Sequence, residues 1–189
     1  MKVSDIKKVA CVGGGVIGSS WAIQYAMRGL SVALYDINDE QLLKSRGQME
    51  KSLDALVGHD AITQTQKAEI VARVHPTTSM EEAVSDAQFI QESGPERLEI
   101  KRSILAQVEQ YAASDALYAS STSGLLISEI VAEAAHPERC VGAHPYNPPH
   151  LIPLVEITRG EKSSDEVVKT VYEHCWPSWL GINREKESA

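Results

Sequence analysis

The chain has 189 residues, of which 43% are hydrophobic and 23% charged, so it is long enough for one globular domain with a sizeable core. Its formal net charge of −8 argues against nucleic acid and against an anionic membrane surface as partners. No apolar run is long enough to cross a bilayer, and residues 1–5 do not resemble the start of a signal peptide.

Three cysteines, Cys11, Cys140 and Cys175, lie far apart and form neither a CxxC motif nor a Cys/His metal spacing. An odd number of distant thiols is typical of proteins that keep their cysteines reduced. We therefore expect a cytoplasmic protein without a metal site. Because Cys11 lies in an apolar stretch, we expect it to be buried rather than reactive.

Apolar stretches alternate with helical patterns along the chain. We expect strands at residues 8–12, 31–35, 87–91, 117–120, 140–143 and 152–157, and helices at residues 16–28, 81–84, 96–112, 126–135 and 165–175. Residues 39–73 have the pattern of two helices separated near Gly58, residues 76–79 that of a turn, and Gly29 that of a helix C-cap. The alternation predicts an α/β fold with a mostly parallel sheet covered on both faces.

Polar segments follow four of the expected strands, at residues 13–18, 92–96, 121–123 and 144–147. The carboxyl ends of parallel strands share one edge of the sheet, and ligands of open α/β sheets bind at that edge. We therefore expect these four segments to meet around one ligand site.

The first segment reads Gly13-Gly14-Gly15-Val16-Ile17-Gly18 and fits the pattern G-x-G-x-x-G. The pattern is weak by itself, but here a strand precedes it, a helix follows it, and Asp36 ends the next strand eighteen residues after Gly18. In such a turn, Gly13 permits the sharp bend, Gly15 lets the backbone approach a pyrophosphate, and Gly18 lets the helix pack on the sheet. The motif predicts a dinucleotide site that also includes Val16 and Ile17.

Asp36 indicates which dinucleotide this site binds. Its carboxylate would accept hydrogen bonds from the adenosine ribose, and residues 37–39 hold no arginine that could receive a 2′-phosphate. NAD is therefore predicted over NADP. The alternative is that the glycines form a turn and bind no cofactor, but that alternative does not explain why an acidic residue, Asp36, ends the next strand.

The fourth polar segment places His144 twelve residues before Glu156, in a stretch that contains Pro145, Pro148 and Pro149. An imidazole exchanges protons near neutral pH, and a carboxylate partner can hold it in one orientation. Because proline cannot donate to a sheet ladder, the prolines predict a rigid loop. Taken alone, His144 could equally be an ordinary loop residue and Glu156 a charge at a strand end.

Five motifs occur in order: GGGVIGSSW at 13–21, LYDI at 34–37, IQESGPERLEIK at 90–101, ASSTSGLL at 119–126 and AHPYNPPHLIPLVE at 143–156. With these motifs the chain resembles the 3-hydroxyacyl-CoA dehydrogenase family, most of all its lambda-crystallin or L-gulonate 3-dehydrogenase branch, and carnitine 3-dehydrogenase is also similar. The resemblance implies a Rossmann-type, doubly wound NAD-binding domain. In the family a helical domain follows, through which the full-length proteins dimerise.

The resemblance also implies roles for individual residues. Ser123 would bind the substrate hydroxyl, His144 would be the general base, and Glu156 would pair with it. Three further residues would contact or position the cofactor: Glu96, Lys101 and Asn147. Without the resemblance, the same sequence allows Ser123 to be a helix cap, Lys101 a solvated helix charge and Asn147 a turn residue.

These roles describe an NAD-dependent oxidation of a 3-hydroxyl to a 3-keto group by hydride transfer. The substrate would be a small 3-hydroxy acid or its CoA ester. The alternative is an NAD-binding pseudoenzyme or structural module with little or no turnover.

The sequence departs from the family in two places. Where acyl-CoA-using members have a serine and, seven residues later, a lysine, this chain has Ser52 and His59 with Asp54 and Asp60 nearby, which favours a free acid as substrate. The chain also ends at Ala189, where the family continues. We therefore expect an NAD-binding domain at residues 1–176 and a divergent, truncated tail at residues 177–189.

Overall fold

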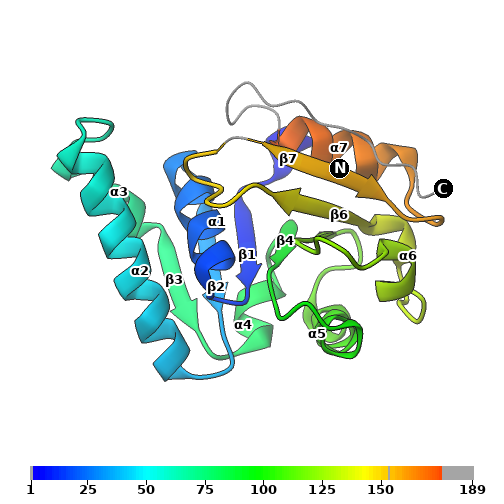
Figure 1. Ribbon diagram of the computed structural model, residues 1–189. Coiled ribbons are helices and arrows are strands. Elements are labelled where there is room, and N and C mark those ends of the chain that lie inside the picture. Colours follow the sequence, from blue (N-terminus) through cyan, green and yellow to red (C-terminus); the bar gives the residue numbers. More distant parts are fainter. Residues whose placement is uncertain (1, 153, 176–189) are drawn as a thin grey trace.

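The structure is a computed structural model that describes residues 2–152 and 154–175. One sheet contains seven strands in the order β3-β2-β1-β4-β5-β6-β7 (Figure 1). Their bounds are β1 (Lys8–Val12), β2 (Ser31–Tyr35), β3 (Val74–Thr77), β4 (Phe89–Glu92), β5 (Leu117–Ser120), β6 (Cys140–Pro145) and β7 (Val155–Arg159). Strands β1 to β6 are parallel, and β7 runs antiparallel to β6.

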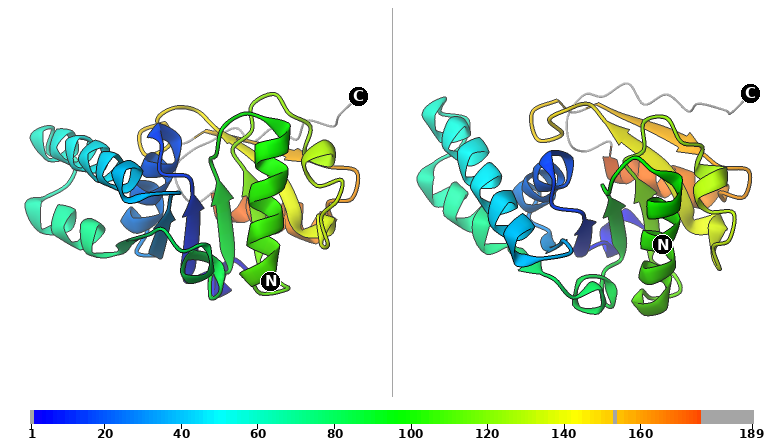
Figure 2. Two further views of the ribbon diagram at one scale, coloured as in Figure 1. Left: turned by 90° about the horizontal axis from the view of Figure 1, so that it is seen from below. Right: turned by 60° about the horizontal axis from the view of Figure 1, so that its bottom comes forward.

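Helices cover both faces of this sheet (Figure 2). Their bounds are α1 (Val16–Met27), α2 (Asp39–Gly58), α3 (Gln64–Ala72), α4 (Met80–Val84), α5 (Leu98–Tyr111), α6 (Ile127–Ile130) and α7 (Asp165–Cys175), with short 3-10 helices at Val3–Asp5 and Pro137–Arg139. Helices α1, α2, α3 and α7 share one buried apolar cluster with the sheet, and α4, α5 and α6 share the other. The predicted doubly wound, mostly parallel α/β fold is confirmed.

Local sequence signals set the ends of the helices that flank the glycine turn. Helix α1 begins after Gly15 and ends before Gly29, whose φ of +83° is a conformation that favours glycine. Helix α2 begins after Asn38, whose side chain accepts a hydrogen bond of 2.9 Å from the Gln41 amide. The predicted break near Gly58 separates α2 from α3.

The turn expected at residues 76–79 is wrong in its first half, because β3 runs through Pro76 to Thr77. The prediction treated the proline as a breaker of structure. Strand β3, however, is the edge of the sheet, and a strand with one neighbour tolerates a residue that has no N–H to donate.

Strand β6 extends two residues beyond the expected 140–143, so His144 and Pro145 lie in a strand and not in the predicted loop. Strand β5 pairs with β6 as far as Gly142, whereas Pro145 lies opposite Val155 of β7. The proline therefore sits where β6 has a neighbour on one side. The following strand, expected to begin at residue 152, begins at Val155.

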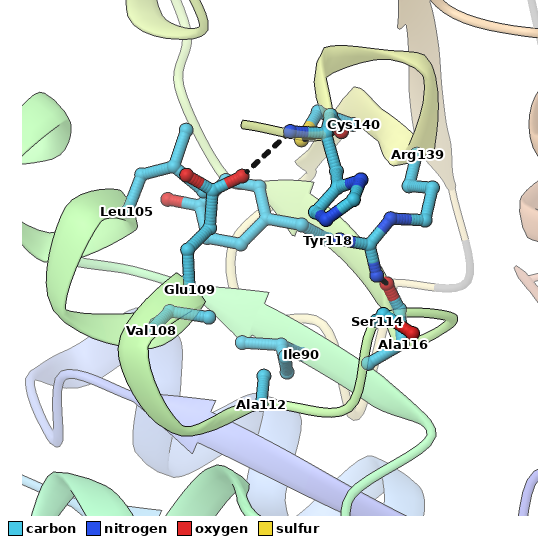
Figure 3. A pocket seen from close by; sticks show the side chains of 11 residues that line it. Ile90, Leu105, Val108, Glu109, Ala112, Ser114, Ala116, Tyr118, Arg139 and Cys140 are labelled. Carbon is cyan, nitrogen blue, oxygen red and sulfur yellow. Dashed lines mark hydrogen bonds between the residues drawn. The ribbon is translucent and has the colours of Figure 1, made fainter. Parts of the chain in front are cut away.

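The helix expected at residues 126–135 is also wrong in length, because α6 ends at Ile130. The carboxylate of Glu109 on α5 accepts hydrogen bonds from the amides of Ala135 (2.9 Å) and His136 (3.0 Å), and these hold the chain in a turn. Figure 3 shows Glu109 among the side chains that line the adjoining pocket. Glu109 and His136 also line a cavity of about 80 Å³ beside the first residues of β5 and β6. This contact with α5 is invisible in the apolar pattern of residues 126–135.

Among the described residues, no helix combines the length and the apolar character that crossing a bilayer requires. All three cysteines are buried, including Cys11 as predicted, and none of them forms a disulfide bond. The tail expected at residues 177–189 lies outside the described residues.

Helix α7 buries an imidazole against the sheet. The His174 ring is stacked on Tyr25 at 5.5 Å between centroids and lies 4.6 Å from the Phe89 ring. In the described part of the chain, neither ring nitrogen has a hydrogen-bond partner. Burial, with a smaller contribution from the charge of Arg28, lowers the pKa of His174 to about 3.

This buried imidazole makes the fold sensitive to acid. Above its ordinary pKa of about 6.5, His174 is neutral in both the folded and the unfolded chain. As the pH falls below that value, only the unfolded chain takes up the proton. The free energy of unfolding therefore decreases by up to about 1.4 kcal/mol per pH unit, until the pH reaches the pKa of His174 in the folded chain. Urea unfolding measures the free energy of unfolding at pH 7 and at pH 5. Its decrease between these pH values should be about 2 kcal/mol smaller in His174→Leu than in the parent chain.

His75→Leu is the matched control, because His75 is exposed on β3. Its pH dependence should equal that of the parent chain. If the free energy of unfolding decreases equally in His174→Leu and in the parent chain between pH 7 and pH 5, His174 is not the source of the acid sensitivity.

Candidate active site

Three glycines of the motif, Gly13 and Gly15 in the turn between β1 and α1 and Gly18 in α1, have three different physical reasons. Gly13 has a φ of +99°, and its amide donates a 2.9 Å hydrogen bond to the Tyr35 carbonyl at the end of β2. A side chain at Gly18 would overlap the Gly13 carbonyl oxygen. A side chain at Gly15 would meet no atom within 4 Å, so the space beside the N-terminus of α1 is open.

Asp36 is fixed beside this turn, as the sequence predicted. One carboxylate oxygen accepts a hydrogen bond of 2.7 Å from the Gly14 amide, and the other accepts one of 2.7 Å from the Ile37 amide. The half-buried carboxylate therefore lies at the end of β2, next to the open side of Gly15. An acidic group at this place suits a ribose with free hydroxyls.

Ser45 also holds the turn, although the sequence analysis did not single it out. Its fully buried hydroxyl donates to the Gly14 carbonyl oxygen from α2. The signal was present, because Ser45 lies on the buried face of α2 together with Leu42, Met49 and Leu53. A serine on an apolar face indicates a hydrogen-bonding task.

The turns after β1, β4 and β5 leave the sheet side by side (Figure 1). Val12 pairs with Glu92, and Glu92 pairs with Ser120, so the three strands end in register. Beyond these ends, the hydroxyl of Ser121 lies 2.9 Å from that of Ser93 and accepts a 3.2 Å hydrogen bond from the Trp21 indole. The structure therefore brings the expected polar segments to one edge.

His144 and Glu156 are directly opposite one another in the β6–β7 ladder. The Nδ1 atom of His144 lies 3.2 Å from a carboxylate oxygen of Glu156. With the Nδ1 proton donated to the carboxylate, Nε2 keeps its lone pair and can accept a proton. The structure thus brings the two residues that were predicted as a base and its orienting acid into direct contact.

Ser123 shares a cleft of about 210 Å³ with His144 and Glu156. The serine is exposed, and the N-terminus of α6 is Leu126 with no side-chain cap, so the helix-cap interpretation of Ser123 is wrong. The cleft thus presents a hydroxyl, an imidazole and a carboxylate to the same small space. Such a set can bind an alcohol and remove its proton.

Glu96 organises the turn that carries Ser123. One of its carboxylate oxygens accepts hydrogen bonds from the Thr122 hydroxyl (2.7 Å) and from the amides of Ser123 (2.8 Å) and Gly124 (3.0 Å). Partial burial by itself raises the pKa of Glu96, but these hydrogen bonds and then the Lys101 ammonium outweigh it and lower the pKa to about 2. Glu96 is therefore an anion that holds the turn in place.

Lys101 faces the interior, and its interpretation as a solvated helix charge is wrong. Its side chain is 1% exposed, and its ammonium donates hydrogen bonds of 2.9 and 3.1 Å to the two carboxylate oxygens of Glu92. The helical period of α5 could have indicated this burial, since Leu105 and Val108 lie on the same face. Glu92 itself was missed because an acid at a strand end is usually solvated.

Asn147 is exposed in the loop after β6, and it is not among the described residues that line the 210 Å³ cleft. A second cleft, of about 560 Å³, lies between α1, α2 and this loop. Ser52, His59 and Lys51 line it, and Lys51 is the one lysine or arginine among its described lining residues. The carboxylate of Asp54 is paired with Lys67 and does not line the cleft.

Together, these features define a dinucleotide-binding domain with a cleft beside it that holds a serine hydroxyl and an imidazole–carboxylate pair. The open space at Gly15, the helix N-terminus and the Asp36 carboxylate fit the pyrophosphate and the ribose of such a cofactor. Residues 8–176 match the family model for the 3-hydroxyacyl-CoA dehydrogenase, NAD binding domain. The chain belongs to this family, and the prediction of NAD as cofactor is confirmed at the level of the family.

Two kinds of known protein are similar to the chain. The L-carnitine dehydrogenase of Pseudomonas aeruginosa is 40% identical over 186 residues, which are 97% of this chain and 57% of that protein. The L-carnitine dehydrogenase of Streptomyces griseus is 40% identical over 166 residues, with 87% and 48% covered. The crystal structure of (S)-3-hydroxybutyryl-CoA dehydrogenase from Ralstonia eutropha has a TM-score of 0.91 at 28% identity, with 96% and 64% covered. The chain thus spans about half the length of these curated relatives.

The glycine turn offers a test that separates folding from cofactor binding. Gly15→Ala should leave the free energy of unfolding nearly unchanged, because its methyl group meets open space, yet weaken NAD binding at least tenfold by filling the space of the pyrophosphate. Gly18→Ala should instead destabilise the fold by more than about 1 kcal/mol, because its methyl group overlaps Gly13. Urea unfolding and calorimetric NAD titration measure the two effects.

Gly47→Ala is the control, since Gly47 lies in α2 with no atom within 4 Å of an added Cβ. It should retain NAD affinity and raise stability by about 0.5–1 kcal/mol. Unchanged NAD affinity in Gly15→Ala would contradict the placement of the pyrophosphate.

Proposed function

We propose that the protein is an NAD-dependent L-3-hydroxy acid dehydrogenase. The observation that carries the proposal is the 210 Å³ cleft, in which His144, Glu156 and Ser123 lie together at the carboxyl edge of an NAD-binding sheet. Oxidising a secondary alcohol requires a base for the hydroxyl proton and an acceptor for the hydride. Bound NAD supplies the acceptor, and the chain supplies the base.

Each residue then has one task. The Ser123 hydroxyl binds the substrate hydroxyl, and Nε2 of His144 accepts the proton of that hydroxyl. The Glu156 carboxylate, 3.2 Å from Nδ1, stabilises the imidazolium that this transfer creates. Glu96 fixes the Ser123 turn, with Lys101 behind it, and Asn147 positions the cofactor from the loop after β6.

We propose a small free 3-hydroxy acid as the substrate, with L-carnitine as the first candidate. The relatives named as L-carnitine dehydrogenases support this choice. The second cleft supports it as well, because Lys51 is its one lysine or arginine among the described residues, and a nucleotide polyphosphate needs several cations. The lambda-crystallin or L-gulonate branch provides the next candidate, L-gulonate.

The proposal places the enzyme in the cytoplasm, which suits three buried cysteines that form no disulfide bond. The domains of this proposal are the NAD-binding unit at residues 1–176 and a tail at residues 177–189. Dimerisation through a further helical domain belongs to the same proposal, by analogy with the family.

The base is tested by removing it. His144→Ala should lower the rate of NADH formation about 10²- to 10⁴-fold, which is the usual contribution of a general base, while the Kd for NAD stays the same. Absorbance of NADH measures the rate, and calorimetry measures the Kd. His136→Ala is the control, because His136 lines the cavity of about 80 Å³ and not the 210 Å³ cleft. This variant should leave both the rate and the Kd unchanged. NAD binding by the parent chain without turnover of any substrate would favour the binding module instead.

Substrate preference is tested with L-carnitine, L-gulonate and 3-hydroxybutyryl-CoA at equal NAD. We expect kcat/KM for a free acid to exceed that for the CoA ester at least tenfold, because Lys51 is the one lysine or arginine that the described residues of the second cleft offer to a polyphosphate. A preference for the CoA ester would overturn the choice of substrate and leave the dehydrogenase proposal intact.

A further inference from the structure

Strand β4 ends in a fully buried carboxylate, Glu92, to which the proposed reaction assigns no task. Its side chain is 0% exposed, and its partner Lys101 is 1% exposed. Removing two charges from water costs several kcal/mol per ion, and a well-packed apolar pair is often at least as stable. A buried pair beside a candidate active site is therefore better explained by positioning than by stability.

Glu92 connects four segments of the chain. Besides the Lys101 ammonium on α5, its carboxylate accepts hydrogen bonds from the Gly94 amide in the next loop (2.6 Å) and from the Ser120 hydroxyl at the end of β5 (2.5 Å). The Lys101 ammonium also lies 3.4 Å from the Gly94 carbonyl oxygen. These contacts fix the ammonium at one point behind the carboxyl edge of the sheet.

From this point the contacts continue to the substrate turn. The Lys101 ammonium lies 3.4 Å from one carboxylate oxygen of Glu96. The other oxygen of Glu96 accepts the hydrogen bonds of residues 122–124, including the amide of Ser123. Glu92 therefore acts on the turn through two successive charges, although it touches neither the turn's amides nor the 210 Å³ cleft.

We propose that Glu92 is a positioning residue for the turn that carries Ser123. It holds the Lys101 ammonium, and so the Glu96 carboxylate, at the place where the amides of residues 123 and 124 converge. Without Glu92, the buried ammonium has Glu96 as its remaining carboxylate neighbour and draws it away from the turn. This inference rests on the proposed function, in which Glu96 and Ser123 serve the nicotinamide end of NAD.

The test is Glu92→Gln, which keeps the size of the side chain and removes its charge. In the 189-residue chain, we expect the amide protons of Ser123 and Gly124 to exchange with solvent at least tenfold faster by NMR, and the Kd for NAD to rise about tenfold, the effect of losing a charge-assisted contact. Affinity for 5′-AMP should stay the same, because Asp36 and the glycine turn bind that half. Glu109→Gln is the control: this acid on α5 holds the amides of residues 135 and 136, away from the site, and should leave both affinities unchanged.

A double variant separates positioning from stability. Glu92→Gln with Lys101→Met removes the unpaired ammonium and should restore the unfolding midpoint, yet exchange should stay fast and NAD binding weak, because Glu96 has lost its cation. If the double variant recovers slow exchange and NAD affinity together with stability, or if Glu92→Gln binds NAD as the parent does, the inference is overturned. A parent chain that binds neither NAD nor 5′-AMP would instead refute the proposed function.

Discussion

The whole site depends on the common register of β1, β4 and β5. Val12, Glu92 and Ser120 end these three parallel strands at one level, so the turns that follow must emerge together. The chain then connects these turns by short polar contacts, such as the one between Ser93 and Ser121. A cofactor that lies along this edge meets a helix N-terminus at one end and the Ser123 turn at the other.

The antiparallel pairing of β7 with β6 has a separate consequence. Because β7 returns alongside β6, Glu156 near the start of one strand lies opposite His144 near the end of the other. Directly opposed residues of an antiparallel pair bring their side chains within contact distance without any loop having to place them. The imidazole and the carboxylate are thus held by two paired strands and not by the loop that the prolines suggested.

Charged side chains connect the interior of the sheet to the turn that carries Ser123. Glu92 and Lys101 are buried, Glu96 is half in solvent, and the turn of residues 122–124 lies beyond it. Such an arrangement lets interior charges define the position of an exposed hydroxyl. The hydrogen bonds to Glu96 hold this polar turn where it forms one wall of the cleft.

The sequence by itself determined the strand–turn–helix order, the glycine turn, Asp36 and the candidate pair His144 and Glu156, because these follow from local patterns and fixed spacings. Ser123 was a candidate only through the family resemblance. It misjudged Pro76, Pro145 and the length of α6, because each depends on parts of the chain that are distant in sequence. Pro76 lies in an edge strand, Pro145 pairs with β7, and the Glu109 carboxylate holds the chain after α6 in a turn. Only the tertiary structure decided that the Lys101 ammonium meets the Glu92 carboxylate. The physical reason is that a helical period can place a lysine on a buried face, but the charge that it meets there is set by which elements pack against that face.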